Sequence, residues 1–340
     1  MAREFRVLLS PGLVDESGRS TFPGVDLRDV QSIESVSIEV LPRQGHPMFE
    51  IEPTMLRDVD ALILHEGRLT ARSLTEHNPV LVARVGAGFD TVDVAAATER
   101  AVTVTTAPDG IRRPLAVAEL SLILDLSLRF REKELIARSG PDAFVRRGTT
   151  IGTGLRGKTL GTLGLGGVAT ELLEIARPLG MEYIACSPRA TREQAELCDA
   201  SLVSIGELFE RSDFLVVNCP LNADTRGLVT ADLLGRMKAT SYFINAARGE
   251  IVDQPALINL LRSRGIAGAA LDVQTVEPIP LGDPLLELDN VILTPHSLCW
   301  TDECFDGIWQ STVRSVKDAA AGVLPTNAIN PEAWRRPTVA

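Results

Sequence analysis

The sequence is short of cysteine, of aromatic residues and of positive charge. Its 340 residues include five cysteines, an odd number without a C-x-x-C pair, and only 4% aromatic residues. Scattered cysteines of this kind are typical of reduced thiols, so no disulfide framework is predicted and we expect no metal site. Lys and Arg number 34 against 45 Asp and Glu, which gives a net charge of −11. That balance argues against nucleic acid or an anionic membrane as the main partner.

Long apolar runs are absent as well. No stretch approaches the length of a membrane-spanning helix, and the segment MAREFRVLLSPG is charged, unlike a signal peptide. We therefore expect a cytoplasmic protein. With 45% hydrophobic and 23% charged residues, the chain has a globular composition and is long enough for two domains.

The most informative stretch runs from Lys158 to Arg189 and predicts a βαβ unit. An apolar strand at 159–165 leads into a glycine-rich turn and a helix pattern that Gly180 ends, and a second short strand follows at 183–186. The turn at the first strand–helix junction has the pattern G-x-G-x-x-A, which in this context predicts a dinucleotide-binding site. The alternative is an ordinary α/β crossover in which the glycines serve turn geometry alone.

Each position of the turn has a physical reason to bind a dinucleotide. Gly164 permits the tight turn, and Gly166 lets the backbone approach a pyrophosphate closely. Gly167 and Val168 begin the helix, whose N-terminus offers free N–H groups and a positive dipole to the phosphates.

The end of the second strand bears on which dinucleotide binds. Units that bind NAD usually place Asp or Glu there to hold the ribose hydroxyls. This chain has Ser187, followed by Arg189 with Arg192 nearby. A serine can donate to the extra phosphate of NADP and a guanidinium can pair with it, so NADP(H) is favoured. NAD(H) stays possible if these arginines are solvated loop residues.

Alternating strands and helices up to residue 105 predict one small parallel α/β domain. Its expected strands are 5–9, 36–40, 61–64, 80–85 and 102–105. A long apolar helix from Pro114 to about Arg131 should leave this domain, and a helix at 308–321 should return to it. Between them, further strands are expected at 214–218, 242–245, 268–272 and 291–294.

The predicted fold class is therefore α/β with two domains. A Rossmann-type doubly wound parallel sheet, in a dinucleotide-binding domain at 115–307, is inserted into a smaller flavodoxin-like substrate-binding domain at 1–114 and 308–340. Ligands of such sheets bind at the carboxyl ends of the strands, so we expect the active site in the cleft between the domains.

Three polar residues follow three of the expected strands. Arg248, Glu277 and His296 can meet where these strands end. Reduction of a 2-oxo acid by hydride transfer needs a cation for the carboxylate, a proton donor at the carbonyl oxygen, and a partner that keeps the donor protonated. A guanidinium suits the first task, an imidazole the second and a carboxylate the third. Alone, each residue could be structural.

With these motifs in order, the chain resembles the D-isomer-specific 2-hydroxyacid dehydrogenase family over roughly residues 60–325. The motifs are VGAGFDTVD at 85–93, the glycine turn, NCPLNADTRGLV at 218–229, NAARG at 245–249, LDVQTVEP at 271–278 and TPHS at 294–297.

The resemblance implies roles for individual residues. Arg248 would orient the substrate, His296 would be the acid/base and Glu277 its partner. The backbone at Ala87 and Gly88 would face the substrate carboxylate. Cofactor contacts are implied along the cleft by Cys219, Pro220, Thr225, Ala246, Arg248, Asp272 and His296. Cys219 lacks an activating basic neighbour, so we interpret it as a packing residue. Family members commonly form homodimers through the nucleotide domain.

Some segments depart from the family pattern. The loop expected at 107–114 is longer and carries Arg112 and Arg113, which could bind a second acidic group of the substrate or form ion pairs. Arg68 is a weaker candidate for the substrate site. Trp300, four residues after His296, could wall the pocket or simply pack.

The predicted function is NAD(P)H-dependent reduction of a small 2-oxo acid, such as glyoxylate or hydroxypyruvate, to the D-2-hydroxy acid, or the reverse oxidation. Two alternatives stay open. One is a dehydrogenase of another small anion, of the formate or phosphite type. The other is a non-catalytic regulator that senses the dinucleotide.

Overall fold

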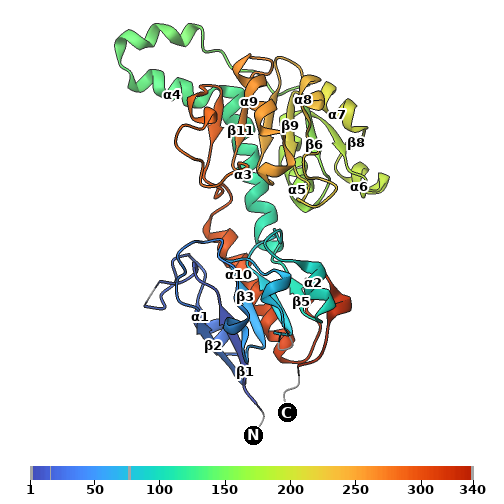
Figure 1. Cartoon of the computed structure of the whole chain (residues 1–340). Coiled ribbons are helices and arrows are strands. Elements are labelled where there is room, and N and C mark those ends of the chain that lie inside the picture. The colour runs from blue at the N-terminus through green and yellow to red at the C-terminus, as the bar shows by residue number, and fades with distance from the viewer. Residues whose placement is uncertain (1–2, 16, 76–77, 338–340) are drawn as a thin grey trace. The chain divides into compact units, whose positions relative to one another are not determined.

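The chain folds into two compact units. The computed structural model describes residues 3–15, 17–75 and 78–337. Unit 1 comprises Met1–Pro114 and Trp300–Ala340, and unit 2 comprises Leu115–Cys299 (Figure 1). The inserted domain was predicted to end at residue 307, whereas residues 300–307 fold with unit 1.

The earlier start of the last long helix accounts for that difference. Helix α10 spans Asp302–Ala320, not 308–321, because the Thr301 side chain caps its N-terminus by accepting from the Cys304 amide and acidic residues fill its first turn. Near its start it crosses the beginning of helix α3, Asp109–Leu128. A Cβ added to Gly110 would lie 2.2 Å from the nitrogen of Ile308, so only glycine permits this backbone contact.

Unit 1 contains a five-stranded parallel sheet in the order β2-β1-β3-β4-β5. Its strands are β1 (Phe5–Leu9), β2 (Val36–Val40), β3 (Ala61–Leu64), β4 (Leu81–Arg84) and β5 (Thr103–Thr105). Its other elements are α1 (Leu27–Gln31), η1 (Pro53–Leu56), η2 (Ala71–Ser73), α2 (Val94–Glu99) and η7 (Pro331–Ala333). The five expected strands are confirmed within a residue or two at their ends. The order reverses at β1, as the flavodoxin-like prediction requires.

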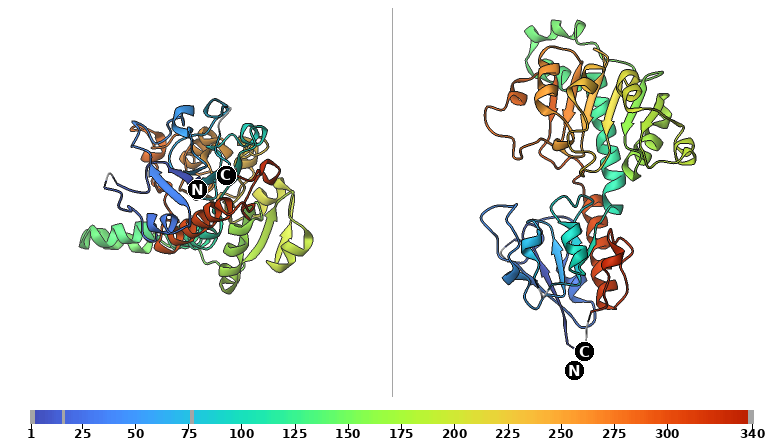
Figure 2. Two further views of the ribbon diagram at one scale, coloured as in Figure 1. Left: turned by 90° about the horizontal axis from the view of Figure 1, so that it is seen from below. Right: turned by 45° about the vertical axis from the view of Figure 1, so that its right-hand side comes forward.

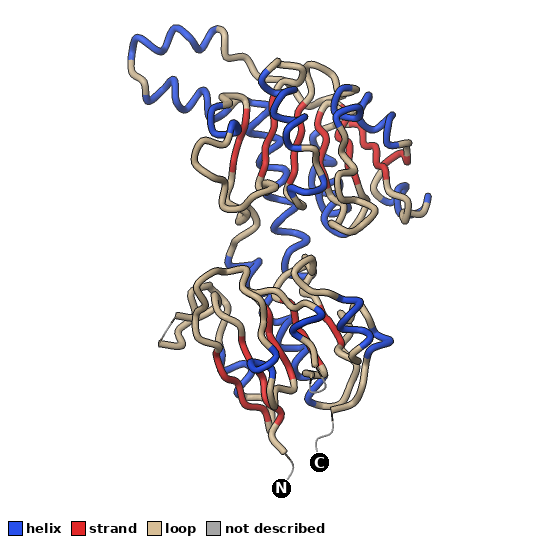
Figure 3. Tube along the Cα trace, in the orientation of Figure 1, coloured by secondary structure: helices blue, strands red, loops and turns tan. Residues whose placement is uncertain are grey.

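Unit 2 contains a seven-stranded parallel sheet in the order β12-β11-β10-β9-β6-β7-β8 (Figure 3). Its strands are β6 (Thr159–Leu163), β7 (Glu182–Cys186), β8 (Ala200–Leu202), β9 (Phe214–Val217), β10 (Tyr242–Asn245), β11 (Gly268–Leu271) and β12 (Val291–Leu293). The sequence analysis missed β8, because two of its three residues are exposed and the segment has no apolar run.

Helices cover both faces of the seven-stranded sheet. They are α3, α5 (Gly167–Ala176), α6 (Arg192–Leu197), α7 (Ile205–Arg211), α8 (Ala231–Gly235) and α9 (Gln254–Arg262), with short turns η4 (Arg177–Leu179), η5 (Gly249–Ile251) and η6 (Pro284–Glu287). Strand β9 shows why two layers form. Phe214 and Val216 enter one buried cluster, while Leu215 and Val217 enter the other. Because successive side chains point to opposite faces, a strand that is apolar throughout needs cover on both sides.

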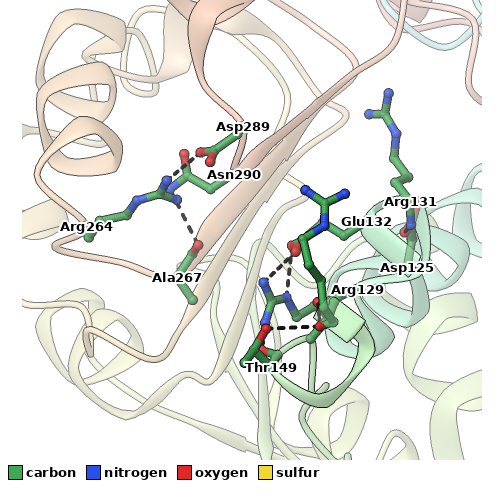
Figure 4. A network of polar contacts seen from close by, with 11 residues as sticks. Asp125, Arg129, Arg131, Glu132, Thr149, Arg264, Ala267, Asp289 and Asn290 are labelled. Atoms are coloured by element: carbon green, nitrogen blue, oxygen red, sulfur yellow. Dashed lines mark hydrogen bonds and ion pairs between the residues drawn. The ribbon is translucent and has the colours of Figure 1, made fainter. Parts of the chain in front are cut away.

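An arm projects from the body of unit 2 (Figure 1 and Figure 2). It consists of helix α4 (Phe130–Arg138) and the turn η3 (Pro141–Gly148). Arg129, in a left-handed conformation with φ of 51°, breaks the long helix expected to continue to residue 131. Its guanidinium pairs with Glu132 and donates to the carbonyl of Thr149 at 3.3 Å, which closes the base of the arm (Figure 4).

The strand order of unit 2 fixes where a ligand would bind. From β6 the chain proceeds outward to β7 and β8, and then returns to place β9 on the other side of β6. The carboxyl ends of β6 and β9 therefore mark the topological switch point, the usual binding position of an open α/β sheet.

Candidate active site

The glycine turn lies at this switch point. Gly164 follows β6 with φ of +105°, and its amide donates to the carbonyl of Cys186 at 2.8 Å. A Cβ there would lie 2.7 Å from the carbonyl oxygen of Asn218, so the close approach of two loops requires glycine. Gly166 is the N-cap of α5, and nothing lies within 4 Å of a Cβ built on it. The first N–H groups of α5, at Gly167 and Val168, thus begin beside open space, which fits the pyrophosphate cradle predicted from the sequence.

The candidate residues for the ribose end follow β7. Ser187 is partly buried and Arg189 is exposed. Among the described residues the Arg189 side chain has no hydrogen-bond or ion-pair partner, so its guanidinium is available to a ligand. Their part in choosing between the two dinucleotides stays a prediction.

The loop after β10 positions Arg248. Asn245, the buried last residue of that strand, accepts from the amide of Ala247 at 3.0 Å and donates to the carbonyl of Arg248 at 2.9 Å. Gly249 lets this loop touch the next one, because a Cβ there would lie 2.1 Å from the carbonyl carbon of Gln274. The partly buried Arg248 side chain donates to the carbonyl of Ala247 at 2.7 Å.

Asp272, directly after β11, organises the loop that carries His296. It is 3% exposed. Its carboxylate accepts from the Thr294 hydroxyl at 2.7 Å and from the amides of Ser297 and Leu298 at 3.1 and 3.3 Å. Its main-chain carbonyl accepts from the amide of His296 at 2.9 Å. This dense bonding holds His296 in a left-handed conformation, with φ of 51°, that a non-glycine residue rarely adopts.

Glu277 and His296 form a hydrogen-bonded pair. Their Oε2 and Nδ1 atoms lie 2.7 Å apart, and the amide of Gln274 donates to the other carboxylate oxygen at 2.9 Å. Burial is the largest single influence on the pKa of Glu277, and by itself it would raise that pKa. The hydrogen bond and charge of His296, the Gln274 amide and the Arg248 charge outweigh it, so the pKa is lowered. The carboxylate is therefore charged at neutral pH, and the structure brings together the three residues of the predicted constellation.

The segment after β9 is mainly structural in its own contacts. The Thr225 hydroxyl donates to the carbonyl of Pro220 at 2.6 Å and accepts from the amide of Asn222 at 2.8 Å, which closes the turn. Burial raises the pKa of the Cys219 thiol to about 11, so this cysteine is a poor nucleophile at neutral pH. Ala246, in the loop after β10, is buried.

The other residues considered for the substrate site lie in unit 1. Ala87 and Gly88 are in the loop after β4, and Arg68 precedes η2. The segment expected to be a loop at 107–114 is helical from Asp109, which places Arg112 and Arg113 in the first turns of α3 and Arg112 3.6 Å from Asp109. Trp300 packs edge-on against Phe22 and Phe305, with ring centres 5.2 and 5.4 Å apart, and stays half exposed. Their contact with substrate stays a prediction.

Sequence reasoning missed some residues that shape the site. Asn245 and Gln274 act through hydrogen bonds to neighbouring loops, and Glu119 is buried beside Asn218. Asn245 and Gln274 lie inside the motifs NAARG and LDVQTVEP, so their positions were visible but their contacts were not. Among the described residues no group of three or more His, Cys, Asp or Glu side chains could hold a metal ion.

The chain is similar in sequence to known proteins over most of its length. The model of the D-isomer specific 2-hydroxyacid dehydrogenase NAD-binding domain matches residues 120–297, just over half of the chain. A D-3-phosphoglycerate dehydrogenase from Methanocaldococcus jannaschii is 35% identical over 285 residues, which cover 81% of this chain and 52% of that protein. A glyoxylate reductase from Aeropyrum pernix is 34% identical over 301 residues, which cover 87% of this chain and 90% of that protein.

A solved structure agrees in fold. The NADPH-dependent glyoxylate/hydroxypyruvate reductase from Sinorhizobium meliloti, in complex with NADP and malonate, has a TM-score of 0.79 at 25% identity and covers 98% of this chain and 99% of its own. The chain spans about half the length of the D-3-phosphoglycerate dehydrogenases that it matches. The family model and the relatives at this level of identity agree, and the chain belongs to the family of D-isomer specific 2-hydroxyacid dehydrogenases.

Proposed function

We propose that the chain catalyses NAD(P)H-dependent reduction of a small 2-oxo acid to the D-2-hydroxy acid, or the reverse oxidation. One observation carries the proposal. His296 and Glu277 are hydrogen-bonded at 2.7 Å, and Arg248 lies close enough to lower the carboxylate pKa, all on the loops that follow three adjacent strands of unit 2.

Each residue then has a definite task. The contact of Glu277 with Nδ1 leaves Nε2 of His296 to give its proton to the carbonyl oxygen of the substrate. Arg248 binds the substrate carboxylate and stabilises negative charge that develops on the carbonyl oxygen. A nicotinamide dinucleotide, when bound, would supply the hydride. Asp272 keeps the His296 loop in place through the bonds described above.

Glyoxylate and hydroxypyruvate are our leading substrates. A glyoxylate reductase and a glyoxylate/hydroxypyruvate reductase are among the relatives that this chain matches over 90% and 99% of their length. Three-carbon acids that bear a phosphate are second in order, because D-3-phosphoglycerate dehydrogenases match only over about half of their length.

NADP(H) is our preferred cofactor. Ser187 and the unpaired guanidinium of Arg189 stand where a carboxylate would favour NAD. Replacing both residues with Ala removes a phosphate partner, so the KM for NADPH should rise about tenfold or more while that for NADH stays within about twofold.

The direct test is steady-state turnover. NADPH and NADH are each assayed against glyoxylate, hydroxypyruvate, pyruvate and bulkier 2-oxo acids, with His296→Ala as the inactive control. Turnover by the wild-type protein that the control lacks supports the proposal. Measurable dinucleotide binding without turnover of any acid would favour the regulator considered above.

We further propose a homodimer through the arm of unit 2. Six large apolar side chains in or beside the arm are exposed, more than a short surface segment needs. They are Leu128, Phe130, Leu135, Phe144, Val145 and Ile151. Sedimentation of the wild-type chain beside a Phe130→Ser, Phe144→Ser variant tests this proposal, since loss of these rings should yield monomers.

The cellular setting that we propose is cytoplasmic. The five cysteines are scattered through the sequence without a C-x-x-C pair, a pattern typical of reduced thiols. In the part of the chain that the structure describes, no helix is long and apolar enough to cross a membrane.

A further inference from the structure

A buried glutamic acid lies behind the switch point of unit 2. Glu119, on the part of α3 that belongs to unit 2, is 0% exposed. Its Oε2 accepts from Nδ2 of Asn218 at 3.2 Å, while Oε1 is buried and has no partner among the described residues. Glutamate is almost never fully buried without a charged partner, and an unsatisfied buried oxygen is costly. Such a residue calls for an explanation other than packing.

The hydrogen-bond partner of Glu119 connects it to the glycine turn. Asn218 directly follows β9, and its amide donates to the carbonyl of Leu163, the last residue of β6, at 2.9 Å. The carbonyl oxygen of Asn218 would lie 2.7 Å from a Cβ on Gly164. Glu119 therefore holds the segment that packs directly against the first glycine of the predicted pyrophosphate cradle.

The charge state of Glu119 follows from its surroundings. Burial raises its pKa to about 8, and the Asn218 hydrogen bond only partly offsets this effect. No charged or titratable side chain on the neighbouring described strands and loops contributes to the shift. The acid is thus neutral at pH 7, and ionisation above pH 8 would place an uncompensated negative charge behind a site proposed to bind an anionic diphosphate.

We propose that Glu119 is a positioning residue for dinucleotide binding, which holds Asn218 against the Gly164 turn through its hydrogen bond. This inference rests on the proposed function, since it assumes that the turn binds a dinucleotide. Glu119 does not lie among the groups that transfer the proton, so it sets cofactor affinity and not the rate at saturating cofactor.

A matched set of variants separates the hydrogen bond from packing. Glu119→Gln keeps the length and the acceptor, Glu119→Met keeps the volume but removes the acceptor, and Glu174→Gln changes an exposed acid on α5 as a control. Dissociation constants for NADPH and NADH are measured by fluorescence. At pH 7 we expect the glutamine variant within about twofold of wild type and the methionine variant about tenfold weaker, with kcat nearly unchanged. Asn218→Ala removes the donor of the same hydrogen bond and should weaken dinucleotide binding to a similar extent. It serves as the test if the methionine variant does not fold.

A second readout needs no cofactor. The folded protein holds the Glu119 proton up to about pH 8, whereas the unfolded chain releases it near pH 4.5. As the pH rises from 4.5 to 8, the stability of the wild-type protein should therefore fall relative to that of Glu119→Gln. Cofactor affinity should also fall from pH 7 to pH 9 more in wild type than in this variant. Identical pH dependence of unfolding, or wild-type affinity in both Glu119→Met and Asn218→Ala, would overturn the inference while leaving the proposed function intact. A wild-type protein that binds neither dinucleotide would overturn both.

Discussion

Two histidines follow strands of the two parallel sheets, and their surroundings are opposite. His296 in unit 2 is 45% exposed in its side chain and bonded to the carboxylate of Glu277. His65 in unit 1 follows β3 and is partly buried. Its amide donates to the Ser10 hydroxyl at 2.7 Å, and its buried Nδ1 atom has no hydrogen-bond partner among the described residues. Burial, followed by the charge of Arg84, lowers the pKa of His65 to about 4.

The difference shows what a strand-end histidine needs in order to exchange protons. Both positions are usual for functional residues in α/β sheets. His65 stays neutral at pH 7, with the ring of Phe22 5.9 Å away, so it carries no proton that it could release as an imidazolium. His296 has a charged carboxylate partner and access to solvent, as the general acid of the proposed function requires. Burial and the charge of the neighbouring side chain, and not the position after a strand, distinguish the two histidines.

The largest expected effect comes from removing the exposed histidine. His296→Ala should lower kcat by about 10²–10⁴-fold, the range lost with a general acid, and should lower the melting temperature slightly because the contact with Glu277 is lost. Turnover with the preferred 2-oxo acid measures the first and thermal unfolding the second. If the variant kept full turnover, His296 would not be the general acid, and the functional contrast with His65 would fail.

The next largest effect is on the free energy of unfolding and comes from His65. The unfolded chain binds a proton at His65 near pH 6.5, whereas the folded protein does so only near pH 4. Stability is therefore lost as the pH falls through this window, by about 3 kcal/mol in total. His65→Gln should show a smaller loss between pH 7 and pH 4.5, measured by urea unfolding. Parallel curves for the two proteins would contradict the assignment of a neutral buried imidazole.

Replacing Glu277 should leave His296, like His65, without a carboxylate partner. Glu277→Gln keeps the shape but removes the charge next to His296, so kcat/KM should fall about tenfold or more at neutral pH. The lowered pKa of Glu277 stabilises the fold above the pKa of an unfolded carboxyl, and that stability is lost as the pH falls through the folded value. The melting temperatures of wild type and variant should therefore converge in acid. A constant difference down to pH 3 would argue against the charged pair.

The smallest effect concerns Trp300, which belongs to the aromatic cluster that also contains Phe22, the neighbour of His65. Trp300→Ala removes a half-exposed ring that contacts Phe22 and Phe305, so it should cost about 1 kcal/mol of stability. Relative KM values for glyoxylate and a bulkier 2-oxo acid test whether the ring also walls the substrate site. A changed ratio supports that role, and a constant ratio with lowered stability shows packing alone.

The sequence by itself determined the features that depend on local pattern. Apolar runs bounded by glycine and turn residues located the five strands of unit 1 and all but one of unit 2. The G-x-G-x-x-A turn required glycine at 164, where φ is +105°. The family resemblance implied that Glu277 is the partner of His296, and their side chains lie 2.7 Å apart.

Only the tertiary structure decided which polar groups are buried and what they bond. Glu119 and Asn218 are 99 positions apart, and Asp272 binds the loop 22–26 positions further on. The neutral state of His65 likewise depends on segments from distant parts of unit 1. Periodicity and turn chemistry act over a few neighbouring residues, whereas burial and charge pairing depend on which distant segments pack together, so these properties appear only once the chain has folded.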